Sequence, residues 1–275
     1  MSLTEQDKIK EQLAAGQIPT RQINADIPTE EIDLPSQGRY YPDGHPLSTG
    51  KILLRYPTAR EEDILTSKNF IQKGTVIDVF LQALVADKRI NLDDMILGDK
   101  NALVISSRIM AYGKEYPVEV SCPSCRANNN VVIDISELQP KEIEGLEKIS
   151  SNDFEIVLPA SKANVRFKVL TQRDDKEVDS ILKQSKKSIG MQTSPEITTR
   201  LRVAILSING NEDRMEIKRF VDSMLTLDSK ALRDEISKVS PDIEMHFAFQ
   251  CEECGHSEER MNMPLGINFF WPGNR

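Results

Sequence analysis

Alternating and helically spaced apolar residues recur along most of the chain and together predict a mixed α+β protein. Helical spacing predicts helices at 75–86, 100–112, 172–187, 195–207, 215–224 and 228–239, with a short helical turn at 91–95. Alternation predicts strands at 51–56, 116–121, 131–135, 154–158, 165–170, 245–250 and 260–263. Strands gathered in hairpins beside groups of helices are typical of α+β folds.

Capping residues mark where several of these helices begin and end. Thr58 and Glu61 have capping-box spacing, so a short helix is expected to begin near residue 59. Thr171 to Asp174 offers a similar cap for the helix at 172–187, and Asp228 is expected to cap the helix that follows it.

The N-terminal stretch differs from the rest, since residues 1–57 hold six of the fourteen prolines. A short helix is expected at 4–15, followed by an extended arm that either lies along its own domain or reaches onto a partner. The whole chain then divides into an arm with a short helix (1–57), a helical unit (58–113), two hairpin segments (114–136 and 245–266), an inserted α+β domain (137–244) and an aromatic tail (267–275).

The four cysteines form two C-x-x-C pairs, Cys122 with Cys125 and Cys251 with Cys254. Each pair lies between two predicted strands, so each is expected at the turn of a hairpin. Gly255 follows the second pair where such a turn often needs a positive φ. Two matched pairs complete a tetrahedral Cys₄ site, so the two hairpins are expected to form a zinc ribbon with the large α+β domain inserted between its halves. We expect one structural Zn²⁺ because four protein ligands leave no position for water.

Three other interpretations of the cysteines remain. They can be reduced, buried side chains, although this does not explain two equal spacings in two similar hairpins. A redox pair favours a strand-to-helix context, which neither pair has. His256 can replace one thiolate, but a turn residue that faces solvent is the simpler interpretation.

Composition narrows the function classes. A hydrophobic fraction of 39% with 28% charged residues is ordinary for a folded chain. No apolar run approaches the ~20 residues of a membrane helix, and the polar start lacks a secretory signal. The net charge is −8, with −2 over residues 246–275 and −1 over 116–136, so phosphate contacts by the hairpins are not favoured.

Catalytic motifs are not evident. The sequence lacks a nucleophile elbow, a metalloprotease helix, a phosphate loop and a dinucleotide fingerprint, and acidic clusters such as Asp93–Asp94 are explained by nearby helix starts. An active site assembled from scattered residues stays a third alternative.

The C-terminal run from 267 to 273 contains Phe269, Phe270 and Trp271. Such a run is too apolar to lie free in water. It either folds into the chain's own core or anchors a partner, since clustered Trp and Phe are frequent interface hot spots.

Several stretches resemble the T4-type bacteriophage baseplate protein family. They are Asp33-Leu-Pro-Ser-Gln-Gly-Arg-Tyr-Tyr-Pro-Asp-Gly, Leu54-Arg-Tyr-Pro-Thr-Ala-Arg-Glu-Glu-Asp-Ile-Leu-Thr-Ser, Leu97-Gly-Asp-Lys-Asn-Ala-Leu, Phe220-Val-Asp, Leu227-Asp-Ser-Lys-Ala-Leu-Arg, Phe269-Phe-Trp-Pro and the paired C-x-x-C motifs. The resemblance runs in order from about 33 to 272, and residues 1–30 lie outside it.

This resemblance implies a non-enzymatic structural or assembly component of the baseplate hub of a contractile-tailed phage. It further implies other tail and baseplate proteins as partners, a place in the host cytoplasm during assembly, and a place in the tail baseplate if the protein stays in the virion. The family supplies no catalytic residues. The alternative from another class is a zinc-ribbon nucleic-acid-binding or transcription accessory protein.

Overall fold

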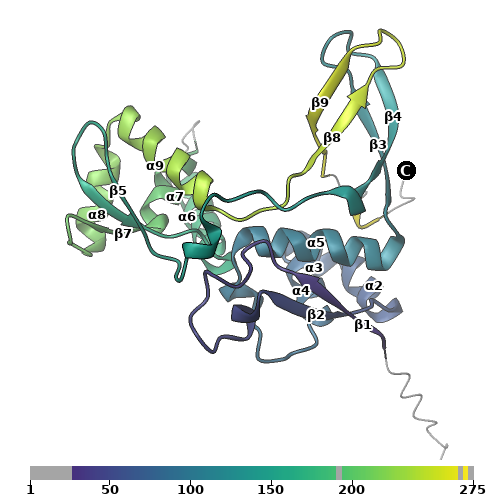
Figure 1. Ribbon diagram of the computed structural model, residues 1–275, viewed down its shortest axis with the longest axis horizontal. Helices are drawn as coiled ribbons and strands as arrows, with labels where there is room; N and C mark the ends of the chain where they lie inside the picture. Colours follow the sequence, from purple (N-terminus) through teal and green to yellow (C-terminus); the bar gives the residue numbers. More distant parts are fainter. Residues whose placement is uncertain (1–26, 190–193, 266–268, 272–275) are drawn as a thin grey trace, which may run out of the picture.

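The computed structural model describes residues 27–189, 194–265 and 269–271, which form two α+β units and two cysteine-bearing hairpins (Figure 1). The helix predicted at 4–15 lies outside these residues. None of the helices in the described ranges combines the length and apolar character that a membrane span needs.

The N-terminal unit, residues 27–113, has a two-stranded antiparallel sheet beside four α-helices. Its elements are β1 (Thr29–Asp33), η1 (Pro46–Thr49), β2 (Lys51–Arg55), α2 (Ala59–Leu65), α3 (Lys68–Lys73), α4 (Val76–Leu84), η2 (Leu92–Asp94) and α5 (Leu97–Tyr112). The capping box of Thr58 and Glu61 is confirmed at the start of α2. Leu54, Phe80 and Leu103 are completely buried in the shared core.

Residues 27–57 of the arm lie along their own domain, which is the first of the two alternatives. Ile32, Leu34 and Tyr41 are buried in the same core as the helices. The carboxylate of Asp99, in the first turn of α5, fixes this segment. It accepts hydrogen bonds from the Ser36 N–H and hydroxyl at 2.9 and 2.6 Å and from the Tyr41 hydroxyl at 2.6 Å.

The inserted unit has a three-stranded antiparallel sheet in the order β5-β6-β7, with helices against it. Its elements are β5 (Phe154–Val157), β6 (Asn164–Phe167), α6 (Gln172–Ile189), α7 (Glu196–Ala204), β7 (Ile205–Ile208), α8 (Arg214–Asp222) and α9 (Thr226–Val239). Val165, Phe167 and Leu232 are fully buried in its separate core.

Two details of the sequence prediction in this unit are wrong. The helix expected to run to 207 ends at Ala204, because Ile205–Ile208 pair with β6 as a third strand that the local spacing does not reveal. Asp228 does not cap its own helix, which begins at Thr226. Its carboxylate instead accepts hydrogen bonds from the N–H groups of Ala160 and Ser161 at 2.7 and 3.0 Å.

The two segments that connect the inserted unit to the hairpins run antiparallel and are bonded to each other. The N–H of Lys141 donates to the carbonyl of Asp242 at 2.8 Å, and the N–H of Glu244 donates to the carbonyl of Gln139 at 2.8 Å. The outgoing segment contains η3 (Ile135–Glu137) and η4 (Leu146–Lys148). The insertion therefore leaves and returns through one paired neck.

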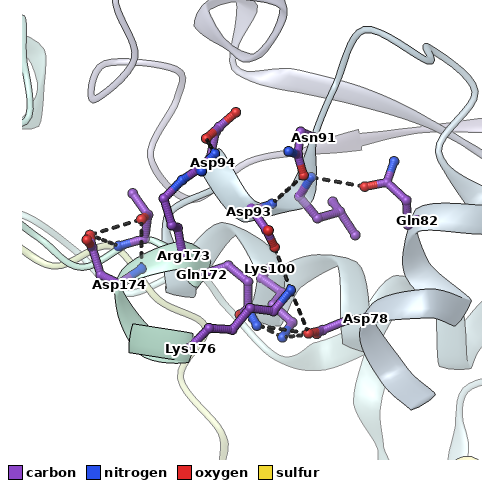
Figure 2. A network of polar contacts seen from close by, with 12 residues as sticks. Asp78, Gln82, Asn91, Asp93, Asp94, Lys100, Gln172, Arg173, Asp174 and Lys176 are labelled. Carbon is purple, nitrogen blue, oxygen red and sulfur yellow. Dashed lines mark hydrogen bonds and ion pairs between the residues drawn. The ribbon is translucent and has the colours of Figure 1, made fainter. Parts of the chain in front are cut away.

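Polar side chains of α6 hold the inserted unit against the N-terminal unit (Figure 2). Lys176 reaches Asp93 at 2.5 Å and Asp78 at 3.3 Å, while Lys100 contacts Asp78 at 2.5 Å and Gln172 at 2.7 Å. Burial acts to raise the pKa of Asp78, but the two lysines outweigh it and lower the pKa. Since Asp78 and Lys100 are both largely buried, their pairing is screened less than a surface ion pair.

The first turn of α5 also touches the returning neck, and this contact yields a test of how the units join. A Cβ added at Gly98 would lie 1.7 Å from the carbonyl oxygen of Pro241. Gly98→Ala is therefore expected to lower the free energy of unfolding by about 1–3 kcal/mol, although alanine is favoured over glycine in a helix by ~1 kcal/mol. Urea unfolding measures the change, with Ser106→Ala on the same helix as control. A stabilised Gly98→Ala protein would show that the neck does not pack here.

Candidate metal centre

The two cysteine hairpins share one local geometry. The first is β3 (Glu115–Ser121) with β4 (Asn128–Asp134), and the second is β8 (His246–Gln250) with β9 (Ser257–Asn262). In each turn the N–H of the first cysteine donates to the carbonyl five residues later: Cys122 to Ala127 at 2.9 Å and Cys251 to His256 at 2.8 Å. Figure 1 shows the hairpins side by side, with their turns meeting at the far end.

The turns also share a residue in the left-handed region four positions after the first cysteine. This residue is Arg126, with φ 64°, in one turn and Gly255, with φ 69°, in the other. The N–H of each donates back to the carbonyl of the first cysteine, at 2.9 and 3.0 Å. The positive φ expected at Gly255 is confirmed, and arginine adopts the equivalent conformation with a side-chain penalty that glycine avoids.

The four sulfur atoms converge between the turns. All lie within 4.8 Å of one another, with Cys122 to Cys254 at 3.8 Å and Cys125 to Cys251 at 3.6 Å. Four thiolates around one tetrahedral ion, with metal–sulfur bonds of ~2.3 Å, have sulfur atoms about 3.8 Å apart. The cluster therefore has both the donor set and the dimensions of a metal site.

Electrostatics around the thiols agree with this interpretation. The N–H of Cys254 is the main influence that lowers the pKa of Cys251 to about 6, against the desolvation that raises it. The N–H of Ala127 acts to lower the pKa of Cys125, but the hydrogen bond with Cys254, desolvation, and the hydrogen bonds with Cys251 and Cys122 together raise it to about 12. A metal ion binds the thiolate form, so an ion bound here would displace the thiol protons.

An apolar cluster supports the cysteines from the inside. Cys122 and Cys251 are buried with Val120 and Phe249, whereas Cys125 and Cys254 lie at the exposed side. Each hairpin thus supplies one buried and one exposed thiol. His256 is not part of the group of converging ligand atoms in the described ranges.

Asn129 is a residue of this site that the sequence analysis missed. Its side chain is 3% exposed, and it contacts both turns, including the sulfur of Cys251. A signal was present, since three consecutive asparagines, 128–130, are unusual in a strand.

The aromatic residues of the C-terminal tail pack into the chain's own core, as the intramolecular alternative expects. Phe269 and Phe270 are each 3% exposed and lie in the core of the N-terminal unit. Phe269 packs edge-on against Tyr116, and Phe270 packs edge-on against Phe80. Trp271 is half-buried beside Phe270. Their role as a partner anchor stays a prediction.

Two other titratable groups, Glu61 and His45, have local structural roles. Glu61 completes the cap of α2 and pairs with Arg55 at 3.3 Å. His45 stacks on Tyr41 and accepts a hydrogen bond from the N–H of Leu47 at 3.2 Å.

The fold and the cluster define an α+β protein with four cysteines placed to hold a metal ion. Comparison with models of known protein families shows which family the chain belongs to. Residues 27–271 match the family described as T4 bacteriophage base plate protein, and the chain belongs to that family. Neither the curated proteins nor the solved structures gave a match. The resemblance in the sequence motifs is thereby confirmed.

Removing one thiolate tests whether the cluster contributes to stability. Cys122→Ser is expected to lower the melting temperature by on the order of 10 °C, because a buried ligand is lost and metal binding is coupled to folding. Differential scanning calorimetry provides the measurement. Ser124→Ala, in the same turn and exposed, is the matched control. Equal melting curves for the Cys122 variant and the unaltered protein would contradict a structural metal.

Proposed function

We propose that this protein is a non-enzymatic structural or assembly component of the baseplate hub in a contractile-tailed phage. Membership in the base plate family over residues 27–271 is the observation that carries the proposal. The protein acts through contacts with other tail and baseplate proteins. It works in the host cytoplasm during assembly, and in the tail baseplate if it stays in the virion.

We propose further that the cluster holds one structural Zn²⁺. Four thiolates form a soft donor set that suits zinc, and a complete set of protein ligands leaves no open position for a reacting water. The ion would fasten the two hairpins to each other and, with them, the two ends of the insertion.

The nucleic-acid alternative has weaker support. Glu252, Glu253 and Glu259 are exposed on the second hairpin, and the side chain of Arg260 pairs with Glu244 at 3.0 Å. A surface with this charge repels phosphate.

Metal analysis tests the zinc proposal. Protein purified without added metal should contain about one zinc per chain by inductively coupled plasma mass spectrometry. The exposed Ser124→Ala variant should keep this content, while Cys251→Ser should lose most of it. A folded protein without metal would refute the proposal, and another ion at the same stoichiometry would refute only the choice of zinc.

Loss of the gene tests the assembly role. A phage with a stop codon in this gene should yield heads and no contractile tails in a non-suppressing host, because an incomplete baseplate cannot initiate a tail. Electron microscopy shows the particles, and supplying the intact gene from a plasmid should restore tails. Normal tails with complete baseplates in the mutant would contradict the role.

A further inference from the structure

Asn129 differs from its neighbours on β4 in a way that points to the metal centre. Asn128 and Asn130 are exposed, whereas Asn129 is 3% exposed and faces the second hairpin. Burying an amide side chain costs free energy unless its polar atoms are hydrogen-bonded. The contacts of Asn129 therefore indicate its role.

Its contacts span both turns. The Nδ2 amide group donates to the carbonyl of Ala127 at 3.0 Å, in its own turn, and to the sulfur of Cys251 at 3.6 Å, in the other. The Oδ1 oxygen accepts a hydrogen bond from the N–H of Glu252 at 2.9 Å. The Asn129 side chain is therefore hydrogen-bonded to its own turn and to both a backbone N–H and a cysteine sulfur of the opposite turn.

These partners also fix the orientation of the amide. The N–H of Glu252 requires an acceptor, so Oδ1 must face it. The carbonyl of Ala127 and the sulfur of Cys251 then face the two Nδ2 protons. A flipped amide would leave all three contacts unfavourable.

The hairpins need such a contact because no backbone ladder joins them in the described ranges. β3 pairs with β4, and β8 pairs with β9, as two separate two-stranded sheets. Near the cysteines, side chains must therefore set the distance and angle between the two turns.

We propose that Asn129 is the positioning residue of the metal centre: it orients the second cysteine pair and donates a hydrogen bond to the Cys251 thiolate. The inference rests on the proposed metal site and adds a specific residue to it. An N–H group directed at a metal-bound thiolate disperses part of its negative charge, and outer-shell partners of this kind typically change metal affinity 10–100-fold.

Two variants of Asn129 test these contacts. Asn129→Ala removes all of them. Asn129→Asp keeps an oxygen for the N–H of Glu252 but cannot donate to sulfur, and it adds charge beside the thiolates. Asn130→Ala, on the same strand and exposed, is the matched control. Each protein is titrated with Co²⁺ to record the thiolate-to-cobalt charge-transfer band, and with Zn²⁺ against a chromophoric chelator.

We expect zinc affinity to fall 10–100-fold in both Asn129 variants and to stay within twofold in Asn130→Ala. The charge-transfer band should move to lower energy in both, because a thiolate without its hydrogen bond releases charge more readily. A role in folding alone would lower affinity without moving the band.

Unchanged affinity, or an unmoved band in both variants, would overturn the inference. The proposed metal site fails separately. If the unaltered protein gives no thiolate-to-cobalt band and binds no zinc, the site itself is refuted and the role of Asn129 falls with it.

Discussion

Closure of the chain at the four cysteines is the constraint on which the rest of the structure depends. Cys125 and Cys251 are 126 positions apart, yet their sulfur atoms lie 3.6 Å from each other. The chain between these cysteines must therefore leave the hairpins and return to them at neighbouring points. The two neck segments do so at the other end of the hairpins, where their backbones are hydrogen-bonded to each other. The entropy cost of closing a loop grows only with the logarithm of its length. A whole α+β unit can therefore be inserted between the two hairpins.

The start of α5 is where the arm, the neck and the inserted unit meet. Asp99 accepts hydrogen bonds from the arm, Gly98 leaves room for Pro241 of the neck, and Asn101 donates to Asp242 at 2.8 Å. On the other side, the N–H of Leu97 donates to Leu170 of the inserted unit at 3.3 Å. Burial raises the pKa of Asp99 although its hydrogen bonds oppose this, so the junction keeps a carboxyl at a desolvation cost. A costly buried group at a junction specifies one arrangement of the parts.

The sequence predicts those features whose cause is local. The cap at Thr58, the positive φ at Gly255 and the paired cysteine turns all follow from residues within a few positions of each other. It fails where a distant partner decides, as in β7, which is a strand because β6 lies beside it, and in Asp228, whose partners are about 68 positions away. Asn129 was missed for the same reason, because its importance comes from a turn that is more than 120 positions away.

The proposed metal site would concentrate negative charge where the two turns meet. Four thiolates around a divalent ion would carry a net charge of −2, which a partly buried place must compensate. Hydrogen bonds from N–H groups supply that compensation: those of Cys254 and Glu253 lower the pKa of Cys251, and the amide of Asn129 contacts the same sulfur. Because N–H dipoles are directed at the sulfur, the acidic side chains of Glu252 and Glu253 can lie beside the cluster, while Arg126 is exposed in the turn of the first hairpin.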